Sequence, residues 1–81
     1  MKLRFSPHFQ RSYRKAPADI QRAFDKQALL LLQNLGHPSL RAKKYDESRD
    51  LWQSRVTRDW RFYFSIEGDT FHLHEIMSHP K

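Results

Sequence analysis

The order of hydrophobic and polar positions divides the first half of the chain into a strand and two helices. Residues 2–5 alternate between basic and apolar side chains, which is the pattern of a short strand. Ser6 and Pro7 are typical of a helix start, and this first helix is expected to end before Pro17. Pro17 opens a second helix, whose apolar positions recur at the helical period: Ile20, Phe24, Ala28, Leu31 and Leu35.

The second half of the chain reads as strands joined by turns. Gly36 is expected to cap the second helix in the left-handed conformation. Residues 37–50 are polar and irregular, with one short strand expected near residues 43–45. Three strand-like segments then follow, at residues 51–56, 60–66 and 70–77. This order predicts a single α+β domain over residues 1–81, in which an antiparallel three-stranded meander carries both helices on one face.

The loop between residues 51–56 and 60–66 fixes which side chains share a sheet face. A three-residue loop at 57–59, with Asp59 in the left-handed conformation, keeps apolar residues opposite one another. A two-residue loop would mix the core and solvent faces, and is therefore rejected. The chosen register predicts two cross-strand pairs, Val56 with Trp60 and Trp52 with Phe64.

A tight turn at Gly68-Asp69 sets the register of the last hairpin. On the apolar face it predicts three pairs: Phe64 with Leu73, Ile66 with Phe71, and Trp60 with Met77. On the other face it predicts two more: Tyr63 with His74, and Ser65 with His72. Glu75 does not fit, because it lies among the apolar positions, and a cation at the sheet edge is expected to pair with it.

The same registers gather polar side chains on the face turned away from the helices. Arg55 falls directly opposite Arg61 there. Since facing like charges destabilise a sheet, an anionic ligand is expected to compensate for them. The other residues of this face are Gln53, Tyr63, His72 and His74. A solvated outer face is the alternative interpretation, because antiparallel sheets commonly have one.

Three histidines lie near the end of the chain, at His72, His74 and His79. Three imidazoles can bind zinc, but no carboxylate or cysteine ligand is suitably spaced, so no metal site is expected. Without a metal, His79 is a candidate general acid or base, because it is a histidine placed where the last strand leaves the sheet. The alternative is an ordinary histidine at a frayed end.

Charge narrows the class of partner. The chain has 81 residues, with 15 Lys and Arg against 9 Asp and Glu, a formal net charge of +6 and a pI near 10.1. Such a domain is attracted to nucleic acid or to an acidic protein. The absence of cysteine excludes disulfide scaffolds and thiolate nucleophiles, and fits a reducing compartment. With no apolar stretch long enough for a membrane and no signal peptide visible, a soluble cytoplasmic domain is expected.

Residues 51–64 resemble the meander of the RelE/ParE superfamily of bacterial toxin–antitoxin toxins. In that family an aromatic and a basic strand residue precede a glycine-containing turn, and an aromatic-arginine-apolar-tyrosine run follows it. Lys43-Lys44-Tyr45 is similar to the lysine-leucine element that usually comes before, and the order of elements matches over nearly the whole chain. The chain departs from the pattern where Arg58-Asp59 replaces the turn glycine. It also stops at Lys81, where members often continue with a tyrosine or a short helix.

The resemblance implies a toxin neutralised by a cognate antitoxin, which is expected to be acidic and partly disordered when free. Many members cleave mRNA in the ribosomal A site without a metal or other cofactor, by attack of a ribose 2′-OH on the adjacent phosphate. Arg61 and Arg55 match basic positions that hold the phosphate, and His79 lies near a C-terminal catalytic position. Contacts to RNA are expected from six further residues: Lys43, Lys44, Gln53, Arg58, Tyr63 and His74.

Two alternatives to an endoribonuclease stay open. Members of the ParE-like branch inhibit DNA gyrase and lack ribonuclease activity. A basic domain with aromatic residues on its sheet also suits a nucleic-acid-binding protein without toxicity, whose signature would be salt-dependent binding and no cleavage.

Overall fold

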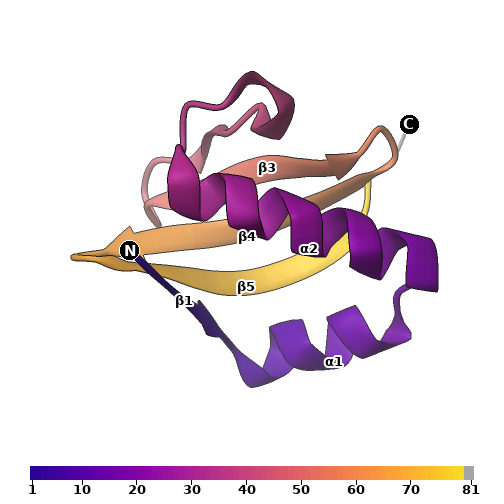
Figure 1. Ribbon diagram of the computed structural model, residues 1–81. Coiled ribbons are helices and arrows are strands. Elements are labelled where there is room, and N and C mark those ends of the chain that lie inside the picture. Colours follow the sequence, from indigo (N-terminus) through magenta and orange to yellow (C-terminus); the bar gives the residue numbers. More distant parts are fainter. Residues whose placement is uncertain (80–81) are drawn as a thin grey trace.

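The computed structural model describes residues 1–79, which form a five-stranded sheet and two helices (Figure 1). The elements are β1 (Lys2–Phe5), α1 (Pro7–Lys15), α2 (Ala18–Gln33), the 3-10 turn η1 (Pro38–Leu40), β2 (Lys43–Asp46), β3 (Leu51–Thr57), β4 (Trp60–Glu67) and β5 (Thr70–Ser78). The strand order is β1-β5-β4-β3-β2, with β1 parallel to β5 and the other neighbours antiparallel. The predicted α+β order is confirmed, and β2 corresponds to the short strand expected near residues 43–45.

Local sequence explains where the helices begin and end. The Ser6 hydroxyl accepts the amide of Phe9 at 3.0 Å, and Pro7 takes the first helical position, so α1 starts as predicted. Helix α2 ends at Gln33 and is capped by Asn34, whose amide donates to the Leu30 carbonyl at 2.8 Å. The left-handed cap expected at Gly36 is wrong. Its amide donates to the Asn34 side chain at 2.9 Å, and the positive φ angles in residues 1–79 lie at Arg41, Asp50 and Gly68.

The core lies between α2, α1 and the apolar face of the sheet. Figure 1 shows α2 crossing the sheet while α1 runs along β5. The rings of Phe24 and Phe62 meet edge to face at a centroid distance of 5.2 Å, which joins α2 to β4. The buried apolar residues are Phe9, Ala16, Ile20, Phe24, Ala28, Leu31, Leu40, Val56, Phe62, Phe64, Phe71, Leu73 and Ile76. None of the helices in residues 1–79 has the length and hydrophobicity needed to span a membrane.

The β3–β4 hairpin keeps two of the predicted contacts and changes the loop. Trp52 faces Phe64 and Arg55 faces Arg61, as predicted. The three-residue loop is wrong, because Thr57 pairs with Trp60 and only Arg58-Asp59 turns. The left-handed Asp59 is wrong as well.

A bulge in β3 explains the difference. Val56 has no partner in the register between Arg55 and Thr57, so it is the extra residue of the bulge. This insertion keeps Val56 buried while the turn stays short. The predicted pair of Val56 with Trp60 is therefore replaced by Thr57 with Trp60.

A second irregularity lies in β5. The pairs Phe64 with Leu73, Ser65 with His72 and Ile66 with Phe71 are confirmed. Beyond Leu73 the register shifts by one residue, so that Tyr63 faces Glu75 and not His74, and Trp60 faces Ser78 and not Met77.

The bulge at His74 also resolves the misfit of Glu75. It turns Glu75 off the apolar face and brings Ile76 opposite Phe62 in the core. The carboxylate of Glu75 then bonds to the ring of His8 on α1. His8 is thus the partner that was expected at the sheet edge.

Candidate functional site

Two arginines face each other at one end of the sheet. Arg55 of β3 pairs with Arg61 of β4, and strand alternation puts both on the face opposite the buried Phe62 and Ser54. The β3–β4 turn holds the Arg61 guanidinium in place. Its Nη1 donates to the carbonyls of Thr57 at 2.7 Å, Trp60 at 2.9 Å and Arg58 at 3.1 Å. A guanidinium has five N–H donors, and none of these three bonds uses the N–H groups of Nε or Nη2.

Arg55 lies among other cations. Its Nε is buried and has no hydrogen-bond partner within residues 1–79. Burial, followed by the charges of Arg41, Arg61 and Arg58, lowers the pKa of the Arg55 guanidinium from its ordinary value, although an arginine stays protonated at neutral pH. We call these four residues, Arg41, Arg55, Arg58 and Arg61, the arginine cluster. None of the ion pairs found in residues 1–79 includes a member of it.

A hollow of about 520 Å³ opens beside the cluster, between α2, η1 and the β3–β4 turn. Arg41, Arg55, Arg58 and Lys26 contribute to its wall, so four cations surround it. Positive charge concentrated in a hollow attracts anions, and phosphate oxygens match the geometry of a guanidinium. The hollow is therefore suited to an anion, but Arg61 does not line it, so it is distinct from the Arg55–Arg61 pair on the sheet face.

Buried hydrogen bonds fix the loop that carries Arg41. The side-chain nitrogen of Gln27 donates to the carbonyls of Ser39 at 3.1 Å and Arg55 at 2.9 Å. The Ser54 hydroxyl donates to the Leu40 carbonyl at 2.8 Å. Arg41 itself has the left-handed conformation, with φ of 46°. Sequence reasoning did not select Arg41, because only the folded path of η1 brings it beside Arg55.

His79 lies at the same end of the sheet as the two arginines. Its amide donates to the carbonyl of Asp59 at 2.6 Å, which ties it to the β3–β4 turn. In Figure 1 the end of β5 rises toward this turn. The three residues selected as candidates for catalysis, Arg55, Arg61 and His79, are thus gathered by the fold around one turn.

Most of the residues expected to contact RNA lie on the sheet face of the arginine pair or at its turn, whereas Lys44 lies on the opposite face. Gln53 and Tyr63 lie next to the arginine pair on the same face, where the Gln53 amide donates to the Tyr63 hydroxyl at 3.0 Å. Lys43 faces Gln53 across β2 and β3 and is exposed, and Arg58 belongs to the cluster. Lys44 faces Trp52, lies 5.4 Å from that ring and bonds to Asp50. Strand alternation therefore separates Lys44 from Lys43.

His74 lies in the β5 bulge. Its Nε2 and the Ser65 hydroxyl are 2.8 Å apart. Burial, followed by the nearby His72, lowers the pKa of the His74 imidazole, so the ring is neutral at pH 7. A neutral ring offers hydrogen bonds to RNA but no charge. Within residues 1–79, no three His, Asp or Glu side chains come together to hold a metal ion.

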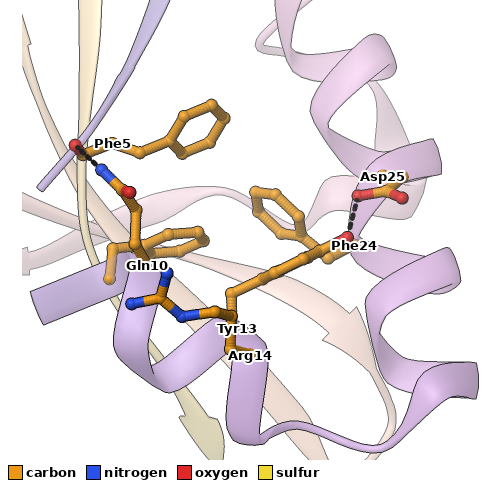
Figure 2. Close-up of a pocket in the computed structure, with 7 residues that line it drawn as sticks. Phe5, Gln10, Tyr13, Arg14, Phe24 and Asp25 are labelled. Atoms are coloured by element: carbon orange, nitrogen blue, oxygen red, sulfur yellow. Dashed lines mark hydrogen bonds between the residues drawn. The ribbon is translucent and has the colours of Figure 1, made fainter. Parts of the chain in front are cut away.

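A separate hollow of about 340 Å³ lies between α1, α2 and the end of β1 (Figure 2). Phe5, Phe9, Tyr13 and Phe24 line it with their rings. The Tyr13 hydroxyl donates to the Asp25 carboxylate at 2.9 Å, and burial, then Asp25, raises the pKa of Tyr13. The phenol therefore stays neutral at the rim of an aromatic recess. The residues that line this recess are distant in the sequence from the predicted site residues, and they belong to β1, α1 and α2.

No family model matches the sequence, and no curated protein matches it. Solved structures do match it over almost its whole length. A YoeB/ParE toxin from Agrobacterium tumefaciens aligns with a TM-score of 0.82 at 14% identity, covering 99% of this chain and 100% of the other. YafQ from Escherichia coli aligns with a TM-score of 0.78 at 15% identity, covering 94% of this chain and 90% of the other.

Some similar structures also contain a second protein. A RelB-RelE antitoxin-toxin complex from Methanococcus jannaschii aligns with a TM-score of 0.78 at 16% identity, covering 93% of this chain and 88% of the other. The TM-scores establish a shared fold, and at identities this low they establish nothing about activity. The chain therefore has the fold that these YoeB/ParE, YafQ and RelE toxin structures share.

Proposed function

We propose that this protein is the toxin of a toxin–antitoxin pair and that it cleaves mRNA on the ribosome without a metal ion. The observation that supports this most is the arginine cluster, which forms no ion pair within residues 1–79 and lies at the same end of the sheet as His79. The sequence resemblance assigns the phosphate to Arg55 and Arg61, and the fold matches toxins over nearly the whole chain. Its partners would be an antitoxin, mRNA and the ribosome.

The chemistry follows from what each group can do. The ribose 2′-oxygen attacks the adjacent phosphorus, and its proton leaves to a base. A bond from phosphorus to O2′ forms while the bond to O5′ breaks and an acid protonates O5′, giving a 2′,3′-cyclic phosphate and a 5′-hydroxyl. Arg55 and Arg61 would stabilise the charge that builds on the phosphate oxygens. His79 is the candidate for one of the two proton transfers, because an imidazole can act as an acid or a base and its backbone is tied to the β3–β4 turn.

The bonds to the turn make Arg61 suited to this role. Three backbone carbonyls orient its guanidinium before any ligand arrives. A preorganised cation loses little conformational freedom when the transition state forms, and its stabilisation of that state is correspondingly greater. Arg55 then adds a second cation directly across the strand pair.

A reconstituted translation reaction tests the proposal. Primer extension on a defined mRNA should detect cleavage by the wild type only when ribosomes are present. Arg61→Ala and Arg55→Ala should lose it, whereas Arg22→Ala, which changes an exposed arginine of α2, should keep it. Intact mRNA together with inhibition of gyrase supercoiling would overturn the proposal in favour of a gyrase inhibitor. Salt-dependent RNA binding without cleavage would favour a non-catalytic domain.

A further inference from the structure

A third hollow lies on the sheet face that carries the arginine pair. It measures about 550 Å³ and is bounded by Tyr45 and Arg49 on one side and by Tyr63, Glu75 and Met77 on the other. We call it the tyrosine groove. Neither Tyr45 nor Met77 takes part in the site described above.

Two of the side chains that line the groove are large and largely apolar, yet they are exposed to solvent. Tyr45 is 56% exposed and Met77 is 44% exposed. The ring of Tyr45 lies 5.1 Å from that of Tyr63, centroid to centroid, with the planes inclined by 71°. Exposed aromatic rings on a sheet face are the surface on which unpaired bases stack.

The loop after β2 holds Tyr45 in this position. The Asp46 carboxylate accepts bonds from the amide and hydroxyl of Ser48, at 3.0 and 2.7 Å, and from Nε of Arg49 at 2.7 Å. These bonds, those from Ser48 and Arg49 above all, lower the pKa of Asp46 to about 2. The loop is therefore braced at neutral pH, and the ring of Tyr45 is presented by a fixed frame.

The strand register connects the groove to the arginine pair. Arg55, Arg61 and Met77 form one row across β3, β4 and β5, and the next row on the same face is Gln53, Tyr63 and Glu75. The two rows are two residues apart, about 7 Å along a strand. This is close to the length of one nucleotide in an extended single strand. A phosphate on the first row therefore puts a neighbouring base over the second.

The charges at the two ends of the groove determine which way round a nucleotide binds in it. Burial would raise the pKa of Glu75, but bonds from His8, Ser12 and the Ile76 amide outweigh it and lower the pKa, so the carboxylate is ionised at neutral pH. A carboxylate repels phosphate, whereas the arginines at the other end attract it. The groove thus favours an uncharged planar group beside an anion.

We propose that the tyrosine groove binds one unpaired nucleobase of single-stranded RNA by stacking on the exposed ring of Tyr45, with Tyr63 in edge contact, next to the phosphate at Arg55 and Arg61. The proposal rests on the proposed function, since it names how that substrate is held. Tyr45 becomes a binding residue that neither the sequence pattern nor the resemblance assigned.

Binding of a short RNA without ribosomes tests the groove. The probe is a fluorescent tetranucleotide with 2′-O-methyl riboses, which removes the attacking hydroxyl and prevents cleavage. Tyr45→Leu should weaken its binding about tenfold, within the range measured for loss of one base–aromatic stack. Tyr45→Phe should bind like the wild type, because the ring is kept. Leu29→Ala, at an exposed apolar residue of α2, is the matched control and should have no effect.

A second probe, with abasic sites in place of its bases, separates stacking from charge. The wild type and Tyr45→Leu should bind it equally, while Arg61→Ala should weaken the binding of both probes. If Tyr45→Leu binds the intact probe as the wild type does, the groove is not a base site, although the arginine site stands. If the wild type binds neither probe, the groove proposal fails, and ribosome-dependent cleavage is judged separately by primer extension.

Discussion

Arg55 and Arg61 face each other across β3 and β4, and neither forms an ion pair with an acidic side chain within residues 1–79. Like charges at facing positions of a sheet destabilise it. The fold accommodates them because Arg61 is bonded to three carbonyls of its own turn. An arrangement that costs stability and concentrates positive charge is typical of a binding site.

Replacing one arginine of this pair should therefore make the free protein more stable. We expect Arg55→Met to raise the midpoint of thermal unfolding, because it removes the repulsion from Arg41, Arg58 and Arg61 while keeping an apolar stem. The gain should shrink at high salt, where the charges are screened. Thermal unfolding at two salt concentrations measures both effects, with Arg22→Met as the control. A lower midpoint for Arg55→Met would show that the charge stabilises the fold.

The buried amide of Gln27 should be important for stability. Gln27→Leu leaves the carbonyls of Ser39 and Arg55 without their donor, which should cost about 2 kcal/mol. Urea denaturation measures the loss. Gln33→Leu makes the same change at an exposed position of α2 and should alter stability by less than about 0.5 kcal/mol. Equal effects of the two variants would contradict the role given to Gln27.

The aromatic contacts of Phe24 should be the strongest tie between the helices and the sheet. Its ring packs on Phe9, Tyr13 and Phe62 at centroid distances of 5.1, 5.9 and 5.2 Å. Phe24→Ala should cost about 3–5 kcal/mol, a large part of the stability of a domain this small. Circular dichroism during denaturation checks this against Leu29→Ala, which is exposed. A loss below about 1 kcal/mol would refute the packing described.

His74 should make stability depend on pH in a defined direction. Burial and the nearby His72 lower its pKa below 6.5, so the folded state binds a proton less readily than the unfolded state. The contribution of a neutral His74 to the free energy of unfolding is present above pH 6.5, and it is lost as the pH falls through the pKa of the folded state. NMR titration should give His74 a pKa below 6.5, and His74→Gln should flatten the fall in stability below that pH. A pKa at or above 6.5 would contradict this.

Much of the fold was predictable because local signals agreed with one another. Ser6 and Pro7 mark the start of α1 by a capping bond that neighbouring residues make alone. The alternation of β4 put Arg61 on the sheet face opposite Phe62 and Phe64. Together with the alternation of β3, this predicted that Arg61 faces Arg55. What the pattern missed were the bulges at Val56 and His74. Each bulge keeps an apolar residue in the core, Val56 itself in β3 and Ile76 in β5, and only the assembled core decides this.

The candidate site was predictable to the same extent. Arg55, Arg61 and His79 could be selected because they belong to strands of known register or follow one directly. Arg41 could not, because its place depends on η1, which Gln27 and Ser54 anchor through contacts distant in the sequence. Tyr45 was expected on a short strand, but its position over Tyr63 depends on the loop that Asp46 braces.

The most direct test of the central claim is inducible expression in bacteria with mapping of mRNA 5′ ends. The wild type should arrest growth and produce new ends within translated messages. Arg61→Ala should lose both effects, while Arg22→Ala, whose side chain is exposed on α2, should keep them. Arrest without new ends, or the same ends from Arg61→Ala, would contradict an endoribonuclease site at the arginine cluster.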